Sequence, residues 1–218
     1  MISSLGAREE LNTAVHEWGG IVFHDVINDR FAHKAIEKGA DGLIPVGAGA
    51  GGHAGTTSPF ALMQEIRVWF DGPVALSGSI ASGAAILSAQ AMGADLAYIG
   101  SAFISTEEAR ASDDYKQGIV DGKAADIIYS NLFTGVHGNY LKKSIENAGL
   151  DPYNLPESDP SKMNFGSGGN TKAKAWKDIW GCGQGIGNID EVLSAGELVA
   201  KFGKEYNTAV RRMQTLTA

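Results

Sequence analysis

Cysteine is nearly absent from this sequence: Cys182 is the only one in 218 residues. A single thiol excludes an intrachain disulfide and offers none of the spaced ligands of a structural zinc site. Long apolar runs are also missing, so no stretch is suited to spanning a membrane. The first residues lack the basic and apolar segments of a signal peptide. We therefore expect a cytoplasmic protein without a metal site.

Basic runs are the second absence. Asp and Glu together number 25 against 18 Lys and Arg, which gives a net charge of −7. This balance argues against nucleic acid or an anionic membrane as a partner. A hydrophobic content of 44% and a charged content of 20% are ordinary for a globular protein. No boundary is visible in the composition, so we expect one domain over residues 1–218.

Glycine, by contrast, is abundant, with 29 residues, and most of the excess follows predicted strands. The densest stretch, residues 42–55, opens as an apolar strand and continues as a loop of glycines and alanines. His53 is the only ionisable side chain in that loop. Glycine at this density permits positive φ or close backbone approach. We interpret the loop as a bare platform for a flat ligand, with one imidazole beside it as general acid or base.

The first half of the chain repeats a strand, a glycine loop, a helix and a short polar turn. Strands are predicted at residues 1–5, 21–25, from 42, at 74–77 and at 96–99, and helices at 7–18, 29–38, 59–70, 80–92 and from about 106. Short, wholly apolar strands are typical of a parallel sheet that is buried on both faces. The alternation predicts an α/β barrel or a doubly wound sheet. The turns at 38–41 and 92–95 share a Gly-Ala-Asp form, which favours the barrel.

From about residue 113 the pattern changes to helices without strands. We expect helices at 115–122, 124–132, 140–149, 173–180 and within 189–213, with a polar connection at 151–169. This mostly helical extension, residues 113–218, should pack on the α/β part rather than form a domain of its own.

The strongest candidate site residues follow predicted strands. His53 lies beyond the carboxyl end of a strand, which is where α/β barrels assemble their active sites. Gly78 with Ser79, and Gly100 with Ser101, each follow a strand and precede a helix. Two successive loops of this kind can bind a phosphate through backbone amides and serine hydroxyls. We therefore expect a phosphorylated cofactor.

Other polar residues carry weaker signals. His24 and Asp25 end the strand before the central stretch and point to the same rim, where a purely structural role is as good an explanation. The glycine loop at 181–185 could cover a ligand. The remaining histidines and two tryptophans are interpreted as helix-face, loop or packing residues: His16, His33, His137, Trp176 and Trp180.

Several segments together resemble a known family. They are residues 50–55 (Ala-Gly-Gly-His-Ala-Gly), 76–80 (Leu-Ser-Gly-Ser-Ile), 99–103 (Ile-Gly-Ser-Ala-Phe), 133–140 and 175–185. The sequence is similar in these segments to the nitronate monooxygenases, formerly called 2-nitropropane dioxygenases, and the resemblance covers nearly the whole chain. It implies a TIM barrel that binds FMN non-covalently. It also implies oxidation of alkyl nitronates or nitroalkanes by dioxygen to a carbonyl compound and nitrite.

The resemblance also implies roles for individual residues. His53 matches the family's active-site histidine, which would contact the nitro or nitronate group and could remove the α-proton of a nitroalkane. Gly51 and Gly52 would let the backbone approach the flavin ring. The FMN phosphate would lie on the loops after the last two strands, at Gly78, Ser79, Gly100 and Ser101. The flavin would supply the redox chemistry while the protein orients it.

Counted back from the last predicted strand, the strands match only strands four to eight of the family's barrel. We therefore expect an incomplete barrel of about the last five βα units, with two open sheet edges. Three explanations stay open. They are a shortened product, a half that is completed by another chain (a homo-oligomer or a complementing partner), and a rearranged fold.

Other functions stay open as well. The FMN-dependent enoyl-acyl carrier protein reductases share the barrel and the Gly-Gly-His loop, and NADH consumption without nitrite release would favour them. An inactive barrel fragment that acts through a partner chain is a second alternative. A sugar-phosphate isomerase or aldolase is less favoured, because such enzymes usually place a lysine or paired acids at strand ends.

Overall fold

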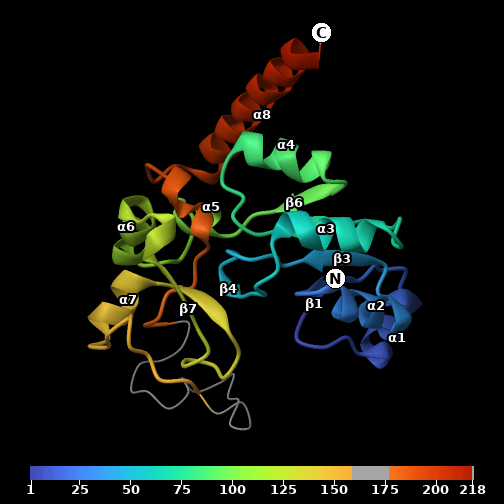
Figure 1. Cartoon of the computed structure of the whole chain (residues 1–218), viewed down its shortest axis with the longest axis horizontal. Helices are drawn as coiled ribbons and strands as arrows, with labels where there is room; N and C mark the ends of the chain where they lie inside the picture. Colours follow the sequence, from blue (N-terminus) through green and yellow to red (C-terminus); the bar gives the residue numbers. More distant parts are fainter. Residues whose placement is uncertain (159–176, 218) are drawn as a thin grey trace.

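The structure, a computed structural model, describes residues 1–158 and 177–217. Five parallel strands form its centre and adjoin in the order in which they occur along the chain (Figure 1). They are β1 (Ile2–Ser3), β2 (Phe23–Val26), β3 (Gly42–Pro45), β5 (Ala75–Ser77) and β6 (Leu96–Tyr98). The first three form one ladder and the last two another, and parallel bridges from Leu43 to Val74 and from Val46 to Ser77 join them. The predicted α/β class is confirmed.

Helices follow the strands in turn. They are α1 (Glu9–Glu17), α2 (Asp29–Glu37), α3 (Pro59–Arg67), α4 (Gly83–Ala91) and the short α5 (Ser101–Ile104). The first four begin and end within three residues of the sequence prediction, and three of them have a capping side chain or a proline at their start. Asn28 caps α2 and Ser82 caps α4 through their side-chain oxygens. The helix expected from about residue 106 is wrong: α5 ends before it, and Thr106 forms a parallel bridge with Leu193.

The two Gly-Ala-Asp turns are built alike. The Asp41 carboxylate accepts a hydrogen bond of 2.7 Å from the Val22 amide, and Asp95 accepts one of 2.8 Å from the Val74 amide. In each turn the amides of the aspartate and of the next residue donate to the carbonyl of that same valine. The same hydrogen bonds therefore close two βα units, as the repeated turn sequence suggested.

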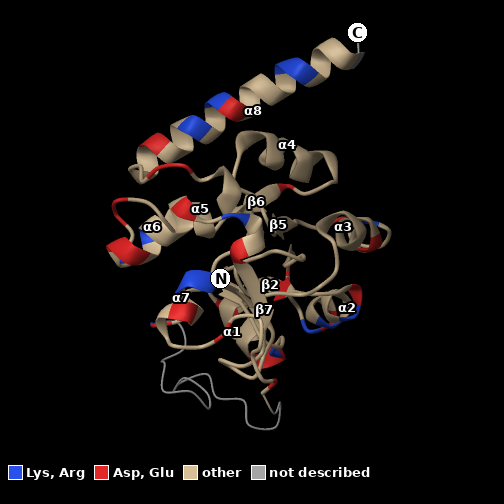
Figure 2. Cartoon of the chain, turned by 60° about the vertical axis from the view of Figure 1, so that its left-hand side comes forward, with Lys and Arg blue, Asp and Glu red and all other residues tan. Residues whose placement is uncertain are grey.

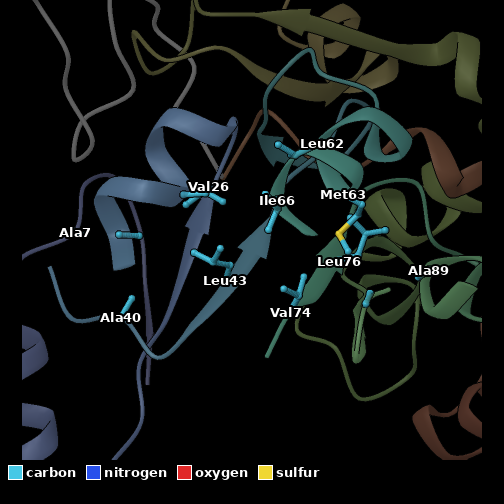
Figure 3. Close-up of a cluster of buried hydrophobic side chains, with 13 residues drawn as sticks. Ala7, Val26, Ala40, Leu43, Leu62, Met63, Ile66, Val74, Leu76 and Ala89 are labelled. Atoms are coloured by element: carbon cyan, nitrogen blue, oxygen red, sulfur yellow. The ribbon is translucent and has the colours of Figure 1, made fainter. Parts of the chain in front are cut away.

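The central strand β3 is buried on both faces. Leu43 packs toward the helices, in a cluster with Leu62, Met63 and Ile66 of α3 (Figure 3). Its neighbour Ile44 points to the other side, where it meets a second group of apolar side chains that includes Phe23, Val46 and Ala75. Burial on both faces explains why this strand is apolar throughout rather than alternating.

The outermost strands of the parallel sheet are open. Ile2 of β1 is 54% exposed and Leu96 of β6 is 58% exposed. No ladder joins β1 to β6 within residues 1–158 and 177–217. The described strands therefore form no closed barrel.

The part of the chain after residue 113 differs from the prediction. Helix α6 (Asp113–Asp121) is confirmed, and α7 (Lys142–Asn147) occupies part of the helix expected at 140–149. The helix expected at 124–132 is wrong: a 3-10 turn, η1 (Ala124–Asp126), leads into strand β7 (Ile127–Ser130). β7 pairs with β8 (Gly138–Leu141) in an antiparallel hairpin. β-branched and aromatic residues in β7 suit a strand better than a helix.

This hairpin continues into a strand of the glycine stretch. β8 also pairs, antiparallel, with β4 (Gly52–His53), so the extension is not a set of helices without strands. Of the helix expected at 173–180, residues 173–176 lie outside the described part of the chain, and residues 177–180 are not helical. The connection at 151–169 lies partly outside it as well.

A long helix closes the chain. It is α8 (Ala195–Thr217), which follows the 3-10 turn η3 (Gln184–Asn188). Its first half packs on α4, and its end projects from the molecule (Figure 1). α4 carries no charged side chain, in contrast to α8 (Figure 2). Among the described helices, none combines the length and apolar character needed to cross a membrane.

Candidate functional site

His53 lies on β4, where the hairpin fixes the backbone of the glycine stretch on both sides. His53 is paired with Gly138, and Gly52 with Asn139. The Asn139 side-chain amide donates to the Ala50 carbonyl at 2.7 Å. The Tyr129 hydroxyl donates to the carbonyl of Ala54 at 2.9 Å. His53 is therefore held on a short strand rather than on a loose loop, so its imidazole has a defined position.

The imidazole itself has a hydrogen-bond partner from the hairpin. His53 Nε2 lies 2.9 Å from Thr134 Oγ1. Burial lowers the pKa of His53 below its ordinary value of 6.5, and the negative charge of Asp25 partly opposes this effect. The lowered pKa keeps the ring neutral at neutral pH. A neutral imidazole in a half-buried position can accept a proton from a ligand.

The larger of two relevant cavities contains His53. Its volume is about 390 Å³, within the range of small-molecule sites. Asp25, His24 and His137 line it together with His53, as do Lys34 and a set of apolar residues: Leu5, Val26, Ile27, Phe31, Val46, Ala54 and Val136. The cavity combines titratable groups with an apolar wall. It can accommodate a small molecule that has both a polar and an apolar part.

Some of the residues that line this cavity with His53 were predicted from the sequence, and others were not. His24 and Asp25 were expected at the same rim as His53, and all three line this cavity. The side chains of His24 and Ser3 are hydrogen-bonded to each other, and the Ser4 hydroxyl donates a hydrogen bond to the Asp25 carboxylate. The sequence assigned no role to His137, which lines the cavity too. The hairpin carries His137, and that hairpin was not recognisable from helix-like periodicity.

A smaller cavity brings together the other predicted residues. Its volume is about 110 Å³, and it is lined by Gly78, Ser79, Gly100, Ser101 and Gly51, together with glycines 181, 183 and 185. Gly52, also predicted, is not among the lining residues and lies in β4 with a φ of 72°. A space of this size suits one end of a ligand, such as a phosphate group, and not a whole cofactor.

The glycine stretch is not a bare platform. The Gln184 amide donates to the Gly49 carbonyl at 2.8 Å, and the Gly183 amide donates to Ser101 Oγ at 2.8 Å. A Cβ on Gly51 would lie 2.8 Å from the backbone of Cys182 and Gly183. The loop at 181–185 therefore packs, backbone against backbone, on the stretch at 49–51. Part of the glycine content serves this packing of the chain on itself.

Each cavity is lined by one residue whose backbone conformation is strained. Among the described residues, a positive φ outside glycine occurs at Leu5 (60°) and at Ser79 (57°). Leu5 lines the larger cavity and Ser79 the smaller. Such conformations cost about 1–3 kcal/mol and cluster at ligand sites. The described residues hold no group of three or more histidines, cysteines and acidic residues placed to bind a metal ion.

Fold and site together define an α/β protein in which one cavity contains a histidine held on a strand and a second cavity is lined by glycines and serines. Two solved structures share this architecture. FabK from Thermotoga maritima matches with a TM-score of 0.79 at 23% identity, over 99% of this chain and 70% of its own. A nitroalkane oxidase from Streptomyces ansochromogenes matches with a TM-score of 0.79 at 25% identity, over 97% of this chain and 65% of its own.

The sequence comparison is more specific. A family model described as nitronate monooxygenase matches residues 4–205. The chain belongs to the nitronate monooxygenase family. Curated relatives include nitronate monooxygenases of Neurospora crassa, 25% identical over 98% of this chain, and of Paraburkholderia phytofirmans, 27% identical over 84%. The chain spans 61% and 54% of the lengths of these two relatives.

Proposed function

We propose that this chain carries the site of an FMN-dependent nitronate monooxygenase, which oxidises alkyl nitronates or nitroalkanes with dioxygen to a carbonyl compound and nitrite. The observation that carries the proposal is the position of His53. This neutral, half-buried imidazole is held by β4 and Thr134 at the wall of the larger cavity. Membership of the family supports the reaction class.

The smaller cavity is compatible with the phosphate end of FMN. Ser79 and Ser101 bring hydroxyl groups, and Gly78 and Gly100 bring backbone that no side chain covers. A Cβ on Gly100 would meet nothing within 4 Å, so the chain itself leaves that space open. These donors match what phosphate oxygens require. A bound flavin would supply the electron-transfer chemistry, and the residues named here would bind and orient it.

Substrate would occupy the larger cavity. The His53 imidazole would contact the nitro or nitronate group, and the apolar residues around Val136 and Phe31 would contact its alkyl part. With a neutral nitroalkane, the imidazole would also take up the α-proton. A nitronate anion needs no such step, so its oxidation would require no proton transfer to His53.

We also propose that the five parallel strands are part of a TIM-type barrel. Their consecutive order, with a helix after each strand, supports this assignment. It places His53 and the two Gly-Ser loops at the carboxyl ends of the strands, which is the active-site side of such barrels. In this assignment residues 1–218 act as one domain.

The test is flavin retention followed by a substrate assay. The visible absorption spectrum of the purified chain is recorded before and after addition of excess FMN and desalting. A retained flavin band, with nitrite release from nitronates, is expected. His53→Ala should abolish nitroalkane turnover and leave the flavin band in place. Loss of the flavin on desalting would contradict the proposal for this chain. NADH oxidation with an enoyl thioester, without nitrite release, would favour a reductase instead.

A further inference from the structure

The hydroxyl group beside His53 has a partner of its own. Thr134 lies in the loop between β7 and β8 and is 1% exposed. Its Oγ1 donates to the Val136 carbonyl at 3.0 Å and accepts from the Val136 amide at 3.3 Å. This local loop of hydrogen bonds is formed within three residues. It fixes the direction of the Thr134 O–H bond without any contribution from His53.

The donor count then determines the protonation of the ring. A threonine hydroxyl has one hydrogen and two acceptor lone pairs. Because the hydrogen points to the Val136 carbonyl, the oxygen presents a lone pair to His53 Nε2, 2.9 Å away. A hydrogen bond at this distance requires that Nε2 carries the hydrogen. In a neutral imidazole the other nitrogen, Nδ1, then carries the lone pair.

A buried tyrosine borders the same hydroxyl. Burial raises the pKa of Tyr140, and a hydrogen bond with Thr134 works in the opposite direction. A hydrogen bond lowers the pKa of a phenol when the phenol oxygen accepts it, so Tyr140 adds no donor to Thr134 Oγ1. The two lone pairs of that oxygen therefore face the Val136 amide and His53 Nε2.

We infer that Thr134 is a positioning residue, which holds His53 in the Nε2–H tautomer so that Nδ1 is the proton acceptor of the site. The inference deepens the proposed function and rests on it for the identity of the proton donor. A nitroalkane would lose its α-proton to Nδ1: the C–H bond breaks, an N–H bond forms, and the electron pair moves onto the nitro group to give the nitronate. The resulting imidazolium still donates from Nε2 to Thr134, so the network need not rearrange.

Nitrogen-15 NMR of the purified chain with labelled histidines reads the tautomer directly and needs no turnover. His53→Gln assigns the His53 signals among the five histidines. Thr134→Val removes the hydroxyl at nearly constant shape, and Thr134→Ser restores it. Thr106→Val is the matched control, because Thr106 is also buried and donates to a nearby carbonyl, that of Phe103 at 2.9 Å.

We expect protonated Nε2 in the wild type, in Thr134→Ser and in Thr106→Val, and a shift toward protonated Nδ1 in Thr134→Val. Thr134→Val should also slow turnover of nitroethane about tenfold or more, since acid–base groups contribute about 10²–10⁴-fold. Turnover of ethyl nitronate should change by less than about twofold, because no proton is removed from it.

Protonated Nδ1 in the wild type would overturn the inference, as would an unchanged tautomer in Thr134→Val. Failure of the wild type to convert either substrate would reject the proposed function. The NMR result would still decide the role of Thr134, so the two failures are distinguishable.

Discussion

The side-chain amide of Asn139 and the backbone carbonyl of Ala50 form a hydrogen bond of 2.7 Å between two buried residues. The two are 89 positions apart in the chain. The bond joins the hairpin to the glycine stretch three residues before His53. The hairpin therefore belongs to the candidate site as much as the glycine loop does.

Replacing this asparagine should weaken the whole fold. Asn139→Ala leaves the buried Ala50 carbonyl without its donor, which costs about 1–3 kcal/mol of unfolding free energy. Urea denaturation measures the loss. Gln64→Ala is the control, because Gln64 makes an exposed hydrogen bond within α3 and its removal should cost less than about 0.5 kcal/mol. Equal losses in the two variants would show that the Asn139–Ala50 hydrogen bond contributes no more to the unfolding free energy than an exposed one.

A methyl group on Gly51 should destabilise the fold, because the loop at 181–185 packs against this residue. Gly51→Ala places a Cβ 2.8 Å from the Cys182 and Gly183 backbone, and forcing that backbone to move costs about 1–3 kcal/mol. Gly203→Ala has the opposite expected sign. Gly203 lies within α8 with nothing within 4 Å, so alanine should stabilise it by about 0.5–1 kcal/mol. Thermal unfolding of both variants tests the contrast, and a destabilised Gly203→Ala would contradict it.

The turn aspartate Asp95 should make stability depend on acid pH. The hydrogen bond from the Val74 amide, and then Arg67, lower the pKa of Asp95 below its ordinary value of 3.8. Its stabilising charge is therefore fully present above pH 3.8 and is lost as the pH falls through the lower folded-state pKa. Asp95→Asn should cost about 1 kcal/mol at pH 7, at the low end because the side chain is 56% exposed. Denaturation at pH 7 and at pH 3 should show that difference shrinking. A constant difference would contradict the charge argument.

The thiol of Cys182 should be inert in the folded protein. The residue is fully buried, and burial raises the pKa of its thiol to about 12. Since the thiolate is the reactive form, a thiol reagent such as DTNB should not react until the chain unfolds. Reaction rates in increasing urea should follow the unfolding curve. Rapid reaction in native buffer would mean that the loop at 181–185 opens readily.

The His53 titration should respond to its acidic neighbour. Burial lowers the His53 pKa below 6.5 and Asp25 raises it in part, so Asp25→Asn should lower it further. An NMR titration of the ring measures both values. For the proposed nitroalkane reaction, the rate should fall as the pH drops through this pKa, because the protonated ring cannot accept a proton. A higher pKa in Asp25→Asn would rule out the Coulombic effect of Asp25.

Most of the parallel half could be predicted from the sequence because its signals are local. Asn28 and Ser82 cap the helices, Pro59 begins one, and the Gly-Ala-Asp turns close two units. Each of these signals acts between residues that are near in the chain. The cavity around Gly78, Ser79, Gly100 and Ser101 followed from the same logic, since neighbouring parallel strands bring their ends together.

The second half was harder because its structure depends on distant partners. Residues 127–130 became a strand by pairing with β8, and β8 in turn pairs with β4 near His53. No helix-type periodicity could reveal these pairings. The covering of Gly49 and Gly51 by residues 182–184 is equally non-local. Thr134 and His137 were missed for this reason, although Thr134 is hydrogen-bonded to His53 and His137 lines the same cavity.

The matched turns at Asp41 and Asp95 bear on the order in which the chain assembles. Each closes a loop of about twenty residues, from Val22 to Asp41 and from Val74 to Asp95. The contacts around His53 span 81 residues to Thr134, and Ser101 meets Gly183 across 82. Short loops close at lower entropic cost than long ones, and proteins rich in local contacts fold faster. The βα units should therefore form early, and the histidine should reach its final environment only when the hairpin docks.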